Sequence, residues 1–293
     1  MKATKGERIF SVFNIIFMIL LSLIFIIPFI TVISTSFVSE QEAISRGSFI
    51  LIPRTFDLGA YKLLLSSGSV IFGAYGVTLF RVVVGTSLNL FFTATLAYGL
   101  SKKNLPGNGI FTTMVFITML FGGGLIPTFL LIKSLGLYNN IWVMVVPNLV
   151  NVWNMFLMRN FFYTIPAELE ESAIIDGATP LVVLIRIIFP LSLASFATIG
   201  LFYAVTHWNS WFDALIYIND IKKMPVQVIM RNIVLNLSSQ DVNNQLMSET
   251  GAQPPAQTLK SAVIIVSTIP ILFIYPFIQK YFVKGMMVGA IKG

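Results

Sequence analysis

Six long intervals of the sequence contain no charged residue, and they constrain the fold more than any other feature. They are residues 9–39, 82–101, 104–132, 134–158, 187–212 and 261–279. Each holds a stretch close to the roughly 20 residues that a helix needs to cross a bilayer. A seventh interval, 63–80, is interrupted by serines and glycines, so we predict a loop there. The expected fold is an all-α integral membrane protein with six transmembrane helices.

The composition agrees with this class and excludes others. Hydrophobic residues make up 56% of the chain and charged residues 11%, which leaves more apolar surface than a soluble domain could bury. The net charge is +7, but the basic residues lie near the ends of apolar intervals, so we expect no nucleic-acid binding. The chain has no cysteine and one histidine, so neither a thiolate nor a multi-histidine metal site can form.

Basic residues at the N-terminus set the expected orientation. Lys2, Lys5 and Arg8 precede an apolar stretch far longer than the core of a cleaved signal peptide, so we expect a retained first helix and a cytoplasmic N-terminus. Six spans then place the C-terminus in the cytoplasm as well. We expect a first helix with an external segment over 1–72, a transmembrane domain over 73–283 and a cytoplasmic tail over 284–293.

Two spans carry polar side chains, and two are expected to be broken. Gly122–Gly124 with Pro127 should kink the third span, and Pro147 the fourth. In the fourth span three asparagines recur at intervals of three, and in the fifth a polar stripe falls within an arc of about 80°. The candidates for a translocation path are Asn148, Asn151, Asn154, Thr198, Phe202, Thr206 and Asn209.

Each of these residues also has a structural explanation. Asn and Thr side chains can hydrogen-bond across a helix bundle and so hold it together without touching a substrate. The lone His207 is more readily explained as a structural residue than as a metal ligand or proton relay. Arg81, predicted near the outer end of the second span, is expected to snorkel or to pair rather than to bind substrate.

The segment 166–190 between the fourth and fifth spans is dense in carboxylates. Pro166 suits the first position of a helix, and Glu168 complements the positive end of its dipole. Gly177 stands where a left-handed C-terminal cap is needed. A second short helix is expected over 178–188, with Val182, Val183, Ile187 and Ile188 on one side.

Two short helices joined at a glycine predict a compact projection on the cytoplasmic surface. Its apolar face, flanked by carboxylates, favours a protein partner over a position flat on the membrane, where interfacial helices carry Lys and Arg. The region 166–190 is therefore expected to dock another protein.

Within this segment the order Glu171, Ser172, Ala173, then Gly177, then Ile187, Phe189 and Pro190 resembles the EAA motif of permease subunits of ATP-binding-cassette importers. The spacing matches throughout, although Ser172 replaces an alanine and Phe189 a leucine. The stretches AYGLSKKNLPG, GGGLIPTFLLIKSLGL, HWNSWFDALIY and YFVKGMMVGAIKG are similar to the maltose-permease-like branch, and within it to permeases for oligosaccharides derived from complex polysaccharides.

The resemblance implies a non-catalytic subunit of a larger assembly. Expected partners are a second homologous permease, two cytoplasmic ATPase subunits that bind ATP and Mg²⁺, an extracytoplasmic solute-binding protein and an oligosaccharide. The sequence contains no GxxxxGK[ST] phosphate loop, which agrees with ATP being bound elsewhere. The implied ATPase-docking residues are Glu170, Glu171, Ser172, Ala173, Asp176, Gly177, Ala178 and Pro190.

Three alternatives are left open. A permease of the same kind could carry a non-sugar solute. A stand-alone secondary carrier should show inverted repeats and intramembrane carboxylates, whereas Glu7 and Asp213 are expected at the edges of spans. A membrane enzyme would need paired acids, a metal cluster or a nucleophile with a base, and none is visible in the sequence.

Overall fold

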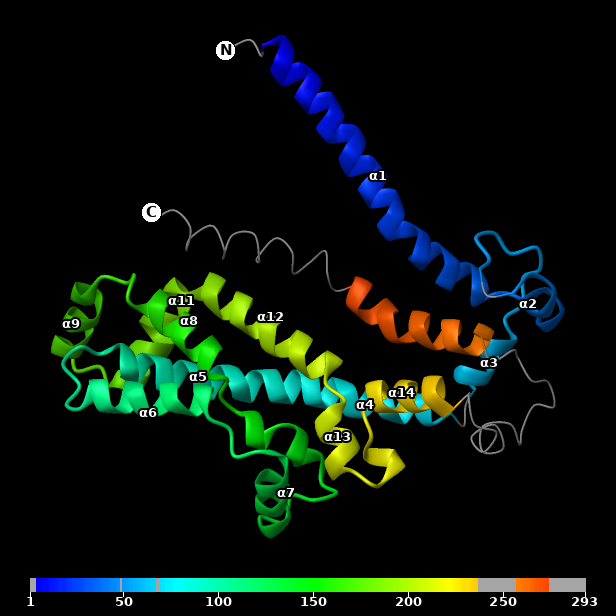
Figure 1. Ribbon diagram of the computed structural model, residues 1–293. Helices are drawn as coiled ribbons and strands as arrows, with labels where there is room; N and C mark the ends of the chain where they lie inside the picture. The colour runs from blue at the N-terminus through cyan, green and yellow to red at the C-terminus, as the bar shows by residue number, and fades with distance from the viewer. Residues whose placement is uncertain (1–3, 48, 67–68, 237–256, 274–293) are drawn as a thin grey trace. The chain divides into compact units, whose positions relative to one another are not determined.

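The computed structural model describes residues 4–47, 49–66, 69–236 and 257–273, and every regular element among them is helical (Figure 1). The α-helices are α1 (Lys5–Thr35), α2 (Glu40–Arg46), α3 (Gly59–Leu64), α4 (Val70–Phe80), α5 (Thr86–Ser101), α6 (Asn108–Leu120), α7 (Leu125–Ser134), α8 (Val152–Phe162), α9 (Ala167–Ile175), α10 (Pro180–Val183), α11 (Phe189–Leu191), α12 (Leu193–Asn209), α13 (Phe212–Tyr217) and α14 (Val226–Asn236). There are also two π-helical turns, η1 (Arg81–Gly85) and η4 (Leu184–Ile188), and three 3₁₀ segments, η2 (Ile141–Met144), η3 (Val146–Asn148) and η5 (Ile221–Lys223). A further helix without a label covers Gln257–Phe273.

Among the residues that the structure describes, two helices are long and apolar enough to cross a membrane unaided, and three bent pairs qualify if each pair is counted as one span. The single helices are Lys5–Thr35 and Val70–Ser101. The predicted breaks in the third and fourth spans are confirmed, since α6 and α7 meet at 112° and Ile141–Asn148 meets α8 at 50°. The third pair, Pro180–Leu191 and α12, is bent by 91°.

The last predicted interval, 261–279, coincides in its described part with an apolar helix over Gln257–Phe273. Its residues beyond 273 and the whole of the predicted tail 284–293 lie outside the described residues.

The prediction of a loop over 63–80 is wrong for residues 63–64 and 70–80, although the described residues 65, 66 and 69 lie outside helices. Residues 59–64 form α3, and Val70–Phe80 forms α4, which continues through η1 into α5 as one helix of 32 residues. Gly73 and Gly76 suggested a loop, but both lie in open space, where an added Cβ would have no atom within 4 Å. A mid-helix glycine costs roughly 1 kcal/mol relative to alanine. Burial of Ile71, Ala74 and Thr78 on one face of α4 outweighs that cost.

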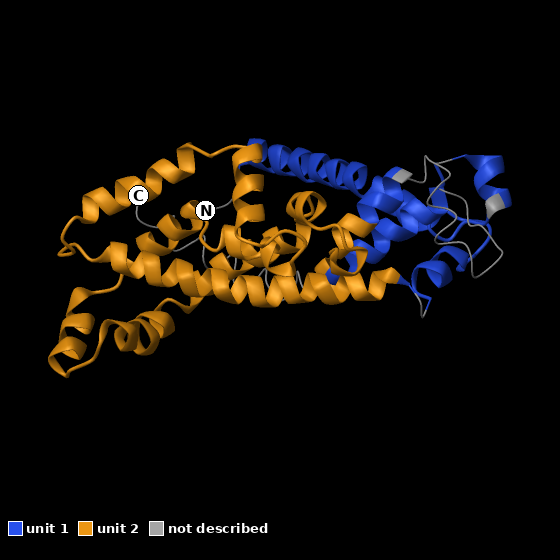
Figure 2. Ribbon diagram, turned by 90° about the horizontal axis from the view of Figure 1, so that it is seen from below, with its two compact units in different colours: residues 1–69, 230–270 blue, residues 70–229, 271–293 orange. Residues whose placement is uncertain are grey.

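The chain divides into two compact units, residues 1–69 with 230–270 and residues 70–229 with 271–293 (Figure 2). In the first unit α1 begins at a capping box, in which Thr4 Oγ1 accepts from the Glu7 amide and the Glu7 carboxylate accepts from the Thr4 amide. The helix rises about 46 Å at 1.5 Å per residue, and its apolar side chains are exposed along its length. It is therefore long enough to span a bilayer with some tilt.

A buried carboxylate organises the segment that follows α1. Glu42 is 6% exposed and accepts hydrogen bonds from the amides of Arg54 and Thr55, from the Thr55 hydroxyl at 2.7 Å and from the Arg46 guanidinium at 2.6 Å. The segment also folds back onto the end of α1, where Ser34 Oγ donates to the Leu51 carbonyl at 2.6 Å. One acidic side chain thus holds together two stretches about a dozen residues apart.

Acid should release this segment. The hydrogen bond from the Thr55 hydroxyl lowers the pKa of Glu42 most, and those from the Arg54 and Thr55 amides add to it. Together they lower this pKa from 4.5 to about 2. Because the pKa is lower in the folded segment, the stabilisation is complete above pH 4.5 and is lost as the pH falls towards 2.

A nitroxide on Gln41→Cys in lipid nanodiscs should therefore become mobile over that pH range. Glu42→Gln should be mobile at every pH, whereas Asp57→Asn should behave as the parent. Unchanged mobility in Glu42→Gln would contradict this role.

The core of the second unit lies where α5, α8, α12 and the segment 183–188 meet. Met155, Met158 and Ile199 are fully buried there, together with Val183 and Ile188. A second apolar cluster joins α7, η2 and α13 around Val143, Met144 and Ala214. The segment 166–190, called the docking segment below after its predicted role, thus packs through residues 183–188 on α8 and α12, which carry Asn154 and the predicted stripe.

Candidate functional site

The first half of the segment 166–190 has nearly the predicted structure, a short helix that ends at a left-handed glycine. Pro166 is the N-cap, with ψ of 132°, and α9 begins at Ala167, one residue later than expected. The difference arises because Pro166 keeps an extended backbone, whereas the first helical residue must have a helical one. Glu168 and Glu170 lie in the first turn, and Gly177 is left-handed at φ +84°, as predicted. The Ala178 amide donates to the Ala173 carbonyl at 2.9 Å and closes the cap.

The second half differs from the predicted helix over 178–188. It consists of α10, the π-helical turn η4 and α11, with Pro190 near the start of α11. A π turn holds more residues than an α turn, which rotates the buried face. Val183, Leu184 and Ile188 are buried, whereas Val182 is 37% exposed, so the predicted apolar side was wrong at Val182 and missed Leu184.

The predicted docking residues fall into an exposed group and an inward group. Glu170 forms an ion pair with Lys102, and Ala173 and Ala178 pack against the buried core. The exposed group is Glu171, Ser172, Asp176, Gly177 and Pro190.

Apolar side chains are also exposed on this segment. Ile174 is 57% exposed and Ile175 85%, and the next short helices add Leu181 and Ile185. Within the described residues, Glu171 and Asp176 beside them form no ion pair. This mixture of exposed apolar and acidic groups is suited to a protein partner.

The three asparagines of the fourth span do not share one helix face. The break at residues 149–151 separates Asn148, which lies in η3, from α8, so the spacing of a continuous helix does not apply. Asn148 is exposed. Asn151 is the N-cap of α8, and its Oδ1 accepts from the Asn154 amide at 3.0 Å. Asn154 itself is 7% exposed.

The polar stripe of the fifth span lies on one continuous helix, α12. Thr198 is buried, Phe202 is half-buried, and Thr206 and Asn209 are exposed. Thr198 Oγ1 donates to the Ala194 carbonyl, Thr206 Oγ1 to Phe202 and Asn209 Nδ2 to Val205, each four residues back. These three donors are satisfied within their own helix, so they do not bind neighbouring helices together.

Hydrogen bonds between helices are made instead by other residues, among them Arg81, His207 and Asn89. Arg81 is 2% exposed in the interior of the helix over 70–101, and not near its outer end, because that helix begins at Val70. Its guanidinium pairs with Asp213 and donates to the Ser210 carbonyl at 3.2 Å. The prediction that Arg81 pairs is confirmed. The side chain of Asp213 is 14% exposed, so this residue is not solvent-exposed as expected for the edge of a span.

The same network continues through His207 to the broken fourth span. Arg81 Nε donates to His207 Nδ1 at 3.3 Å, and His207 Nε2 lies 2.6 Å from Asn89 Oδ1. Because the arginine nitrogen can only donate, Nδ1 accepts and the imidazole proton is on Nε2, facing Asn89. The Asn89 amide then donates to the carbonyls of Asn148 and Leu149 at 2.7 and 2.8 Å.

This arrangement satisfies carbonyls that the break in the fourth span leaves without a helical partner. Both imidazole nitrogens of His207 have hydrogen-bonding partners, Arg81 and Asn89. His207 therefore links α12 to the helix over 70–101. An asparagine in the apolar run 82–101 was the one signal in the sequence that could have pointed to Asn89.

A second link joins the same helices. Tyr203 accepts from the Asn151 amide at 2.9 Å, and its hydroxyl lies 2.7 Å from Thr93 Oγ1. One tyrosine on α12 thus holds both α5 and the start of α8, beside the predicted path residues.

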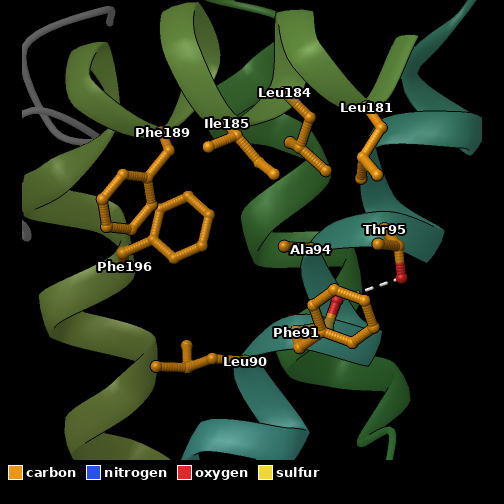
Figure 3. A pocket seen from close by; sticks show the side chains of 9 residues that line it. All are labelled: Leu90, Phe91, Ala94, Thr95, Leu181, Leu184, Ile185, Phe189 and Phe196. Carbon is orange, nitrogen blue, oxygen red and sulfur yellow. Dashed lines mark hydrogen bonds between the residues drawn. The ribbon is translucent and has the colours of Figure 1, made fainter.

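An open pocket of about 300 Å³ lies between α5 and the docking segment (Figure 3). Its walls are Leu90, Phe91, Ala94, Thr95, Leu181, Leu184, Ile185, Phe189 and Phe196. The one hydroxyl, that of Thr95, donates to the carbonyls of Phe91 and Phe92 within its own helix. A sugar needs several hydrogen-bonding partners, so this pocket does not suit an oligosaccharide.

Comparison with known proteins shows relatives over essentially the whole chain. The "Polygalacturonan/rhamnogalacturonan transport system permease protein YtcP" of Bacillus subtilis (strain 168) is 45% identical over 287 residues, which covers 98% of this chain and 99% of that protein. "Protein LplC" of the same organism is 44% identical over 293 residues, covering 100% and 98%. No profile of a protein family matches the chain.

A solved structure is similar in fold and in sequence. It is described as a "bacterial ABC transporter involved in the import of the acidic polysaccharide alginate", and its matching chain is 32% identical with a TM-score of 0.88. The match covers 96% of this chain and 99% of that one.

Proposed function

The chain belongs to the carbohydrate permeases of ATP-binding-cassette transporters, and on that premise we propose that it is one of two permease subunits of an importer for acidic oligosaccharides. The observation that carries the proposal is the match over nearly the full length to one permease named for polygalacturonan and to one importer of alginate. Polygalacturonan is by its name a polymer of a sugar acid, and alginate is an acidic polysaccharide. Two relatives with acidic cargo favour an acidic cargo here.

The assembly proposed around this subunit has four further parts. A second homologous permease completes the membrane cavity, two cytoplasmic ATPases bind ATP and Mg²⁺, and an extracytoplasmic protein delivers the sugar. This chain would contribute six spans in the cytoplasmic membrane, with both termini in the cytoplasm and its transmembrane domain over 73–283. It would catalyse no reaction itself.

Coupling would pass through the segment 166–190. The exposed carboxylates Glu171 and Asp176 beside exposed Ile174 and Ile175 support docking to an ATPase. ATP binds the closed ATPase dimer better than the open one, so its binding would draw the docking segments of the two permeases together. Because the segment packs on α5, α8 and α12, the motion would turn the cavity from inward-facing to outward-facing.

Uptake by a reconstituted complex tests the proposal. Proteoliposomes holding both permeases and both ATPases, supplied with the binding protein, are expected to accumulate labelled oligogalacturonate only when ATP is inside with the ATPases. Neutral maltooligosaccharide of the same length is the matched control and should not accumulate. Uptake by the permeases without ATPases would overturn the importer proposal, and preference for the neutral sugar would overturn the acidic cargo.

Asn151 offers a test of the translocation path that leaves the fold intact. Asn151→Asp keeps the cap of α8, because a carboxylate accepts from the Asn154 amide as well as an amide oxygen does. If Asn151 lines the path, the new charge should repel an acidic sugar by about 1 kcal/mol at close range in water and raise the KM for uptake about fivefold.

The matched control for this variant is Asn140→Asp, which changes another N-cap asparagine, that of η2. It should leave the KM unchanged. Equal KM values for both variants and the parent would assign Asn151 to capping alone.

A further inference from the structure

Lys102 lies where the second span ends, and its backbone is held firmly. α5 stops at Ser101, and Lys102 is its extended C-cap at ψ 111°. The side-chain Nδ2 of Asn108, at the start of α6, donates to the carbonyls of Leu100 and Lys102 at 3.1 and 2.6 Å. The side chain of Lys102 therefore projects from a well-anchored point.

That side chain reaches the first helix of the docking segment. Lys102 Nζ pairs with the Glu170 carboxylate and lies 3.8 Å from the centre of the Tyr98 ring. The side chains of Lys102 and Glu170 are 33% and 18% exposed, so the pair is partly shielded from solvent, unlike an ordinary surface pair. Within the described residues, Glu170 is the one carboxylate of 166–190 in an ion pair.

α9 has little else to hold it against the spans. None of its residues is buried, and Leu169, Ile174 and Ile175 are 43%, 57% and 85% exposed. Ala173 supplies a small apolar contact with the core, and the short stretch after α8 supplies the covalent connection. The Glu170 side chain is thus the polar attachment of α9 to the second span.

We propose that Lys102 is a positioning residue, which ties α9 to α5 so that movement of the docked helix is transmitted to the second span as well as to α8. This inference rests on the proposed function, since it assumes that α9 is moved by an ATPase. α5 carries Asn89 and continues from Arg81, and these residues hold α12 and the broken fourth span. A displacement of Lys102 would therefore be transmitted to α5, α8 and α12.

Neutral and conservative variants test the proposal in the complete complex in nanodiscs, with binding protein and oligogalacturonate. Lys102→Met should lower the ratio of ligand-stimulated to basal ATPase activity roughly fivefold or more, the change expected from losing about 1 kcal/mol of attachment. Lys102→Arg should retain the ratio. Lys103→Met is the matched control, because it removes the neighbouring exposed charge, and it should match the parent.

Charge exchange separates an ion pair from a packing role. Glu170→Lys alone should lower the ratio, and Lys102→Glu combined with Glu170→Lys should restore most of it. Thermal unfolding of each complex, followed in parallel, should stay within a few degrees of the parent.

The pH profile is a further measurement that a packing role would not move. Burial lowers the pKa of the Lys102 ammonium from 10.5 to about 8. The groups that the structure places against Nζ are the Glu170 carboxylate of α9 and the Tyr98 ring of α5. The Tyr98 hydroxyl also donates to Glu170 Oε2 at 3.5 Å, whereas the Asn108 side chain of α6 bonds the Lys102 carbonyl and not Nζ. The stimulation ratio should therefore fall as the pH rises through about 8 in the parent but not in Lys102→Arg, which stays charged.

Two failures can be told apart. If the parent complex shows no ligand-stimulated ATPase activity, the proposed function is wrong. If the parent is stimulated and Lys102→Met behaves like Lys103→Met, the proposed function stands and the positioning role of Lys102 is wrong.

Discussion

Replacing Gly177 by leucine is expected to uncouple transport while the protein still reaches the membrane. Gly177 has φ of +84°, a conformation that costs an ordinary residue about 1–2 kcal/mol. That cost should lower the population of the observed turn about 5–30-fold, and oligogalacturonate uptake with it. Gly177 itself is exposed and a Cβ there meets no atom within 4 Å, so the substitution should not disturb the neighbouring core and insertion should survive.

Gly177→Asn is the matched control. A Cβ at this position meets no atom within 4 Å, and asparagine adopts the left-handed conformation more readily than other side chains. It should retain most of the uptake, because asparagine tolerates the left-handed turn although its side chain branches at the γ position as leucine's does. Equal loss in both variants would show that the glycine is needed for a close approach of the partner and not for its backbone angle. Normal uptake and ligand-stimulated ATPase activity in Gly177→Leu would contradict the role of the turn altogether.

Removing the carboxylate of Asp213 should have the largest effect on stability. Arg81 is 2% exposed, and Asp213→Ala would leave its charge buried without a counterion. Breaking a buried ion pair from one side costs about 3–5 kcal/mol. The amount of protein in the membrane and its thermal stability in detergent should both fall sharply.

A paired replacement distinguishes the charge from the shape of the side chains. In Arg81→Met with Asp213→Leu no charge is left unpaired, so most of the lost stability should return. Lys223→Met removes one partner of an exposed pair 3.7 Å long and should change the stability by less than about 1 kcal/mol. A double variant no more stable than Asp213→Ala would show that His207 and Ser210 need the guanidinium itself.

The broken spans and the polar links are connected features of this protein. Pro147 interrupts the fourth span, and the carbonyls freed just after it are taken by Asn89, four residues from Gly85. A Cβ on Gly85 would lie 2.6 Å from His207 Nε2, so glycine there allows the histidine to reach Asn89. An irregular backbone is tolerated in a membrane helix where neighbouring helices satisfy its freed polar groups, as Asn89 does for the carbonyls of Asn148 and Leu149.

Several parts of the fold and site follow from neighbouring residues. The membrane class came from charge-free intervals of sufficient length. The breaks at Gly122–Gly124 and Pro147 and the left-handed Gly177 came from residues that determine their own backbone angles. The predicted loop failed over 70–80 because packing of Ile71, Ala74 and Thr78 overrode the weak preferences of two glycines. A weak local preference yields to packing in this way, whereas a proline or a left-handed glycine does not.

What the amino-acid sequence by itself determined is therefore local: membrane helices, their breaks, the capped turn of the docking segment and the family whose motif that segment carries. The tertiary structure alone decided which polar groups meet. Arg81 and His207 are 126 residues apart, and His207 and Asn89 118. Hydropathy and backbone preference act over a few residues, whereas the partner of a buried polar side chain is fixed only when distant helices pack and every donor must find an acceptor.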